Sequence, residues 1–123
     1  MRIYLAGSFK AQERLRDIRR RIEIIGHECA SCWLDESKTA EIVQCAKRDI
    51  SDISKSNLLI LDMFDKHTSG GCEVEFGIGL ALNYRMKLYV VGPKRNIFHE
   101  LCDMHFDNWD DCLQYLRQLV LPF

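Results

Sequence analysis

The order of secondary structure in this chain is decided by residues 58–84, LLILDMFDKHTSGGCEVEFGIGLALNY. The apolar run at residues 57–63 predicts a strand buried on both faces, as strands of a parallel sheet are. A glycine turn then opens a predicted helix over residues 72–84. A strand that leads through glycines into a helix places backbone N–H groups and the positive end of a helix dipole at the carboxyl edge of the sheet.

Two carboxylates, Glu73 and Glu75, occupy this edge, where a nucleotide-triphosphate loop would carry a lysine. The glycines at 70–71 permit close approach, and Gly77 and Gly79 are expected to leave the helix face beside Glu75 bare. A carboxylate held ionised in a crowded cleft of small residues is what a glycosyl-transferring nucleophile requires. The alternative is that Glu73 is a solvated surface residue and that Glu75 only caps the helix.

Strands and helices alternate along the whole chain. This alternation predicts an α/β fold: a three-layer doubly wound sheet, flavodoxin- or Rossmann-like, of about five mostly parallel strands with helices on both faces. The 123 residues are expected to form a single domain, 1–123. The predicted strands are 2–6, 27–33, 57–63, 87–91 and 105–106, and the predicted helices are 10–25, 39–55, 72–84 and one that starts at Asn108.

In such sheets the ligand crevice lies beyond the carboxyl ends of the strands, where the strand order reverses. Three loops are expected there: the turn at residues 7–10, the stretch after Trp33, and residues 65–71. Gly26 is a suitable C-cap for the first helix. Thr39 is expected to cap the second helix, whose predicted inner face carries Ile42, Val43, Ala46, Ile50 and Ile53.

Composition excludes several classes of function. The chain is 47% hydrophobic and 28% charged with a net charge of −1, so polymeric nucleic acid and membrane surfaces are not expected partners. No apolar run approaches the ~20 residues that span a bilayer, and the first residues read as a strand, so a cytoplasmic location is expected. The five arginines of the first helix are spread around it, which predicts a solvated face.

Six cysteines include one C-x-x-C pair, Cys29 and Cys32. A zinc site would need a second pair or histidines at ligand spacing, and a thioredoxin-type motif would open a helix. We therefore expect reduced structural thiols, no metal and no organic cofactor.

Three features, in order, resemble the nucleoside 2-deoxyribosyltransferase family, which includes the 2′-deoxynucleoside 5′-monophosphate N-glycosidases. They are the strand and turn IYLAGSF at residues 3–9, Asp49 eight residues before Asn57, and the spacing Ser69-Gly70-x-x-x-Glu75-x-Gly77-x-x-x-Ala81. Asn57 stands where the family usually has an aspartate. The resemblance covers nearly the whole chain.

The resemblance implies catalytic roles for two carboxylates. Glu75 matches the family's nucleophilic glutamate, which attacks the anomeric carbon of the sugar. Asp49 matches an aspartate near the departing base, which positions the base and helps to supply a proton. Glu73 competes for the first role, but only Glu75 has a glycine two residues on and an alanine six residues on.

The resemblance also implies where the 5′ end of the substrate lies. Ser69 stands where the transferases have an aspartate that holds the sugar 5′-hydroxyl, and where the monophosphate hydrolases have a serine that binds the 5′-phosphate. Ser8 and Lys10 match a serine and a basic residue at the hydrolases' phosphate end, although Ala11 and Gln12 replace extra glycines there. A hydroxyl and backbone N–H groups can donate to a phosphate, which an aspartate would repel. The implied substrate-binding residues are Tyr4, Gly7, Ser8, Phe9, Lys10, Ser69, Gly70 and Gly71.

The implied enzyme cleaves the N-glycosidic bond of a (deoxy)nucleoside 5′-monophosphate, a small-molecule substrate. The first alternative is a transferase that moves deoxyribose between bases. The second is a nucleotide-binding module of the same fold without turnover. The third is a structural α/β domain, which predicts an exposed Glu75 remote from Asp49.

Family members close their crevice with a neighbouring subunit, so the resemblance implies a homodimer or a dimer-based oligomer. Asn96 and Asn108 are the polar candidates for the residue that one subunit lends to the other. The expected contact surface is on the third helix and comprises Gly79, Leu80, Leu82, Asn83 and Tyr84.

Overall fold

A computed structural model describes residues 1–37, 41–66 and 70–120. Within these residues five strands form one sheet in the order β2-β1-β3-β4-β5, and every neighbouring pair is parallel. The elements are β1 (Arg2–Ala6), η1 (Phe9–Ala11), α1 (Gln12–Ile25), β2 (Glu28–Cys29), η2 (Cys32–Asp35), α2 (Ile42–Ser54), β3 (Leu58–Asp62), α3 (Gly71–Ala81), β4 (Lys87–Val91), η3 (Ile97–Leu101), β5 (Met104–Phe106) and α4 (Trp109–Gln118), where η marks a short 3-10 helix.

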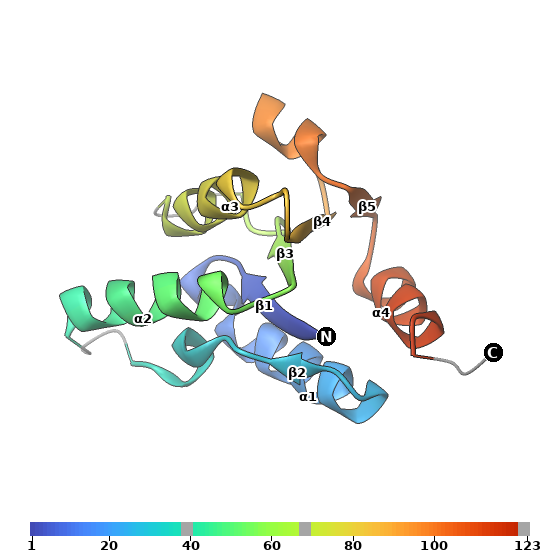
Figure 1. Ribbon diagram of the computed structural model, residues 1–123, viewed down its shortest axis with the longest axis horizontal. Coiled ribbons are helices and arrows are strands. Elements are labelled where there is room, and N and C mark those ends of the chain that lie inside the picture. Colours follow the sequence, from blue (N-terminus) through green and yellow to red (C-terminus); the bar gives the residue numbers. More distant parts are fainter. Residues whose placement is uncertain (38–40, 67–69, 121–123) are drawn as a thin grey trace.

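Helices cover both faces of this sheet, as Figure 1 shows. Helices α1 and α4 pack together on one face, and α2 and α3 pack together on the other. The predicted three-layer α/β fold is confirmed, and the sheet is parallel throughout. The chain winds outward in opposite directions from β1 and β3, so the crevice of a doubly wound sheet opens at the carboxyl ends of these two strands.

The core runs along the central strands, because β1, β3 and β4 are buried on both faces. Gly79 lets α3 approach this core closely: a Cβ at Gly79 would lie 2.5 Å from Cδ2 of Leu88 on β4. A Cβ at Gly77 would meet nothing within 4 Å. The prediction that these two glycines bare the helix face beside Glu75 is wrong, since Gly79 faces the sheet and neither lines the pocket described below.

Strand β2 is much shorter than the predicted 27–33. The last backbone hydrogen bond to β1 runs from the Ala30 N–H to the Ile3 carbonyl at 2.9 Å, and side chains supply the next ones. The Leu5 N–H donates to Ser31 Oγ at 2.7 Å, and the Leu5 carbonyl accepts from Trp33 Nε1 at 2.7 Å. Both backbone groups of Leu5 are therefore satisfied without a strand beside them. The chain is free to turn into η2.

Helix α2 begins later than predicted. Its N-cap is Glu41, whose carboxylate accepts from the N–H groups of Val43 and Gln44, and the predicted cap Thr39 lies outside the described residues. The predicted inner face is only partly buried: Ile53 is inaccessible, whereas Ile42 is 80% and Val43 56% exposed. The reason is visible in Figure 1, where the first turns of α2 project beyond the strands of the sheet.

All six cysteines are free thiols. Over the described ranges, none of the helices is long and apolar enough to cross a membrane.

Candidate active site

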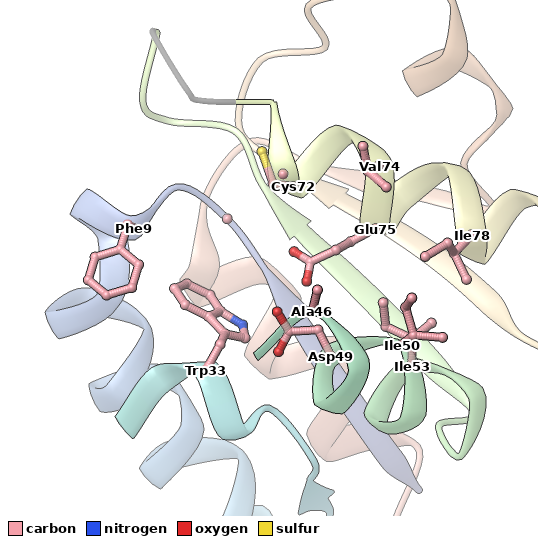
Figure 2. A pocket seen from close by; sticks show the side chains of 12 residues that line it. Phe9, Trp33, Ala46, Asp49, Ile50, Ile53, Cys72, Val74, Glu75 and Ile78 are labelled. Atoms are coloured by element: carbon pink, nitrogen blue, oxygen red, sulfur yellow. The ribbon is translucent and has the colours of Figure 1, made fainter. Parts of the chain in front are cut away.

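A pocket of about 340 Å³ opens between α2, α3 and the turn after β1. Figure 2 shows the carboxyl groups of Asp49 and Glu75 facing each other across it, each from its own helix. The remaining lining is almost entirely apolar. The lining residues are Gly7, Phe9, Trp33, Ala46, Asp49, Ile50, Ile53, Gly71, Cys72, Val74, Glu75 and Ile78.

Glu75 is held by a neighbour from the sheet. The hydroxyl of Tyr4, a fully buried residue of β1, donates a hydrogen bond to Glu75 Oε2. Burial raises the pKa of Glu75 to about 8; the Tyr4 hydrogen bond opposes this rise, and the charge of Asp49 adds to it. The expectation of a carboxylate held ionised is therefore wrong for the free protein at neutral pH, because desolvation outweighs the Tyr4 hydrogen bond.

Tyr4 remains a hydrogen-bond donor at any physiological pH. Its own pKa is well above the usual value because of burial and the nearby carboxyls of Glu75 and Asp49. A phenol that keeps its proton stabilises the ionised form of Glu75 more than the neutral form. Tyr4 therefore orients the carboxyl of Glu75.

Asp49 faces the same pocket from α2. Burial raises its pKa to about 6, with further contributions from the carboxylates of Glu36 and Asp52, and Arg48 opposes the rise. One of its oxygens, Oδ1, is buried and has no hydrogen-bond partner in the protein. The pKa of the Asp49 carboxyl therefore lies close to neutral pH, and its Oδ1 has no hydrogen-bond partner in the protein.

The pKa values of the two carboxyls differ because their surroundings differ. Glu75 has a donor aimed at it, whereas Asp49 has two acidic neighbours and a free oxygen. The higher pKa belongs to Glu75, so the form in which Glu75 is ionised and Asp49 is protonated is the minor one in the free protein. The alternative of an exposed Glu75 remote from Asp49 does not describe this pocket.

Two aromatic side chains form one wall of the pocket. Phe9 and Trp33 lie with ring centroids 6.3 Å apart, and the Trp33 indole is fixed by its hydrogen bond to Leu5 and by burial. Phe9 was expected at the site, but Trp33 was not. The available signal was its place at the start of the second of the three loops expected at the carboxyl edge, where an aromatic residue can face a ligand.

Ser8 and Lys10 lie beside the pocket and do not line it. The Ser8 hydroxyl donates to Asp65 Oδ2 at 2.7 Å, and Arg14 contacts both Asp65 and the buried Asp62. The Ser8 hydrogen bond, then Arg14 and Lys10, lower the pKa of Asp65, so this edge holds an ionised carboxylate. Arg14 also corrects the expectation that every arginine of the first helix is only solvated.

The amino-terminal end of α3 opens toward the pocket. Gly70 is its N-cap with a φ of 92°, a conformation that favours glycine, and Gly71 lines the pocket. The predicted phosphate ligand Ser69 lies outside the described residues.

Glu73 belongs to a different cluster from Glu75. The carboxylate of Glu73 accepts from Asn96 Nδ2 at 3.0 Å and contacts His99 Nε2 at 2.8 Å. His99 Nδ1 accepts the Arg95 N–H, so the proton of the neutral ring lies on Nε2 and is donated to Glu73. This cluster ties η3 to α3, which separates Glu73 from the pocket.

The two asparagines proposed to reach a neighbouring subunit are both engaged within this chain. Asn96 caps η3 through Oδ1 and contacts Glu73 through Nδ2. Asn108 caps α4, where its Oδ1 accepts from the Asp111 N–H at 2.8 Å. Neither is free to extend into another subunit.

In the described part of the chain, no group of three His, Cys, Asp or Glu side chains is arranged to hold an ion.

No family model and no curated protein sequence matches this chain. Solved structures do. The 2-deoxyribosyltransferase of Bacillus psychrosaccharolyticus superposes with a TM-score of 0.79 at 18% identity, covering 94% of this chain and 92% of its own. The CMP N-glycosidase of Clostridium botulinum gives 0.70 at 20% identity and covers 96% and 99%. The 2-deoxyribosyltransferase of Leishmania mexicana gives 0.69 at 15% identity and covers 98% and 99%.

The chain therefore has the fold of these deoxyribosyltransferases and of the CMP N-glycosidase. The resemblance inferred from the first strand, Asp49 and the Glu75 spacing is confirmed at the level of fold.

Proposed function

We propose that the protein cleaves the N-glycosidic bond of a (deoxy)nucleoside 5′-monophosphate and releases the free base. The observation that carries this proposal is the pair of carboxyls with unlike surroundings across one apolar pocket, with Glu75 oriented by Tyr4. The solved structures of the same fold support it, because they include enzymes named for deoxyribosyl transfer and for CMP N-glycoside cleavage.

In the proposed mechanism the ionised Glu75 attacks the anomeric carbon from the face opposite the base. The bond from this carbon to the base nitrogen breaks, its electron pair leaves with the base, and Asp49 supplies the proton that neutralises it. Water then attacks the glycosyl–Glu75 ester and releases the sugar phosphate. Tyr4 keeps the carboxylate aligned and stabilises its charge before attack.

The proposed phosphate position is over the first turn of α3. Backbone N–H groups beside Gly70 and Gly71 and the helix dipole favour an anion there. Lys10 is close enough to Asp65 to lower its pKa, and it adds a positive charge at the same edge. Ser8 can donate to a phosphate only by leaving Asp65.

The test is a panel of nucleosides and their 5′-monophosphates, incubated with and without a free acceptor base and read by chromatography. Release of base from monophosphates without acceptor is the expected result. Products that form only with an acceptor base would favour the transferase, and binding without any product would favour the nucleotide-binding module.

We also propose that two copies of the chain pair through α2 and α3, beside the mouth of the pocket. Apolar side chains there face solvent: Ile42, Val43, Ile50 and Val74 are 80%, 56%, 53% and 66% exposed. Ile50 and Val74 also line the pocket, so a second copy on this surface would narrow its opening.

This surface differs from the one expected on the third helix. Gly79 packs against the sheet, and Asn83 is bound to the Met86 carbonyl and to Asp103. Of that group only Tyr84, 81% exposed, presents a large open side chain.

A further inference from the structure

A carboxylate of the chain itself occupies a set of anion donors beside the pocket. The Ser8 hydroxyl donates to Asp65 Oδ2 at 2.7 Å, and Nη2 of Arg14 donates to the same oxygen at 3.1 Å. The Ser8 hydrogen bond, followed by Arg14 and Lys10, lowers the pKa of Asp65, so this carboxyl is ionised at neutral pH. A hydroxyl, a guanidinium and an ammonium group are also the donors with which proteins bind phosphate.

This donor set adjoins the pocket. Ser8 lies between Gly7 and Phe9 on the turn after β1, and both of these neighbours line the pocket. Ser8 is only 7% exposed, so its hydroxyl is held in place, whereas the side chain of Asp65 is 27% exposed and can turn toward solvent. A ligand group at this turn therefore meets a fixed hydroxyl and a displaceable carboxylate.

Arg14 is held in place without Asp65. Its Nε and Nη2 donate to the carboxylate of Asp62 at 3.2 and 2.9 Å, and its guanidinium lies 5.7 Å from the centre of the Phe64 ring. Asp62 is 1% exposed and also accepts from Trp109 Nε1 at 2.7 Å. Nη2 carries two hydrogens, so the one that points to Asp65 becomes available to another anion when Asp65 turns away.

The charges at this edge distinguish a phosphate from a hydroxyl. Arg14 and Lys10 are balanced by the carboxylates of Asp62 and Asp65. A phosphate carries nearly two negative charges at neutral pH, so it would be repelled by an ionised Asp65 that stayed in place. A neutral 5′-hydroxyl brings no charge and can donate to the same carboxylate. Asp65 therefore opposes the binding of a 5′-phosphate and not that of a 5′-hydroxyl.

We propose that Asp65 is a resident anion that competes with the 5′-phosphate of the substrate for Ser8 and Arg14, and so sets how strongly nucleotides are preferred over nucleosides. The phosphate displaces the side chain of Asp65 and accepts from the Ser8 hydroxyl and from Nη2 of Arg14. This inference rests on the proposed function in taking the 5′ end of the ligand to lie between the turn after β1 and the first turn of α3.

The test compares nucleotide and nucleoside binding in the absence of turnover. In the Glu75→Gln background, calorimetry at pH 7.5 measures the affinities for the 5′-monophosphates of deoxyadenosine, deoxyguanosine, deoxycytidine and thymidine, and for the four nucleosides. Asp65→Asn keeps the size and an acceptor oxygen and removes the charge. We expect it to tighten monophosphate binding by at least about tenfold and to change nucleoside binding by less than about twofold, because only the phosphate is repelled by Asp65.

Asp35→Asn is the matched control. Asp35 is also paired with an arginine of α1, since Nη1 and Nη2 of Arg19 donate to its two oxygens at 2.8 Å, and its substitution removes the same charge from the protein. Asp35 does not line the pocket, so Asp35→Asn should leave both sets of affinities unchanged. Ser8→Ala added to Asp65→Asn should weaken monophosphate binding again by about tenfold, because it removes a hydrogen bond to a charged group.

Three results would overturn the inference: unchanged or weaker monophosphate binding in Asp65→Asn, an equal gain in Asp35→Asn, or no monophosphate binding by any of these proteins. The outcome is separable from the proposed function. A gain in Asp65→Asn without base release by the unmodified protein would contradict the glycosidase and leave the role of Asp65 standing. Base release from monophosphates with no gain in Asp65→Asn would do the reverse.

Discussion

At the scale of single residues, two glutamates two positions apart lie in different parts of the structure. Glu75 lies in the pocket against Tyr4, and Glu73 lies in the cluster with Asn96 and His99. Residues i and i+2 of an α-helix lie on different faces, so only one of the two can reach the pocket. The pair therefore supplies a nucleophile candidate and its own matched control.

We expect Glu75→Gln to reduce base release by at least about a thousandfold, because an amide cannot form the glycosyl ester. Glu73→Gln should retain nearly full activity, since the amide oxygen can still accept from His99 and Asn96. Initial rates on the substrate identified by the panel check both. Retained activity in Glu75→Gln, or loss confined to Glu73→Gln, would transfer the role to Glu73.

The pH dependence of kcat/KM should show a plateau. Glu75 must be ionised, and its ionised fraction rises with pH and levels off above its pKa of about 8. Asp49 must be protonated, and its protonated fraction falls as the pH passes its pKa of about 6. The product of these two fractions rises with pH to about 6, is level to about 8 and falls above, with about 1% of the free enzyme productive on the plateau.

Asp49→Asn is the diagnostic variant for this profile. Without the need for a protonated Asp49, the residual rate should rise with pH and then stay level above the pKa of Glu75, which is lower once the Asp49 charge is gone. Rates measured from pH 5 to 9 check this. A falling alkaline limb in Asp49→Asn would show that another group supplies the proton.

At the scale of elements, the position of Glu75 depends on how closely α3 sits on the sheet. Gly79 is the contact that sets this distance, because its missing Cβ leaves room for Leu88 of β4. Tyr4 of β1 reaches Glu75 across the same interface.

Gly79→Ala should therefore lower the free energy of unfolding by about 1–3 kcal/mol, since the added methyl group overpacks against Leu88. Gly77→Ala is the control: its Cβ meets nothing, and a helix-interior alanine should raise stability by about 0.5–1 kcal/mol. Urea denaturation of the two variants measures the difference. Equal effects would mean that α3 does not pack on the sheet through Gly79.

At the scale of the whole molecule, the apolar turns of α2 that project past the sheet need a partner surface to be buried. We expect the protein to sediment as a dimer and Ile42→Asp to shift it toward the monomer, because a carboxylate would be desolvated at the interface. Ile24→Asp is the control, since Ile24 is 78% exposed on α1, on the opposite face of the sheet. Sedimentation velocity over a concentration series distinguishes them, and dissociation by Ile24→Asp alone would place the interface on the other face.

The sequence by itself determined the alternation of strands and helices, the layered α/β architecture and the candidate carboxylates Glu73 and Glu75. These features follow from local rules that act over a few neighbouring residues. Examples are the apolar runs at residues 57–63 and 87–91, the end of α1 at Gly26, and the capping of α4 by Asn108. Asp49 was assigned through the family resemblance, because no helical periodicity links its position to that of Glu75.

Tertiary structure alone decided which groups meet. Strand β2 stops early because Ser31 and Trp33 bind Leu5, a strand away, and Trp33 thereby becomes a wall of the pocket. The pKa of Glu75 is raised to about 8 by burial, which is opposed by the hydrogen bond from Tyr4 on β1 and reinforced by the charge of Asp49 on α2. The burial and the hydrogen-bond partners of a side chain depend on residues that are distant in the sequence, so no local sequence pattern predicts them.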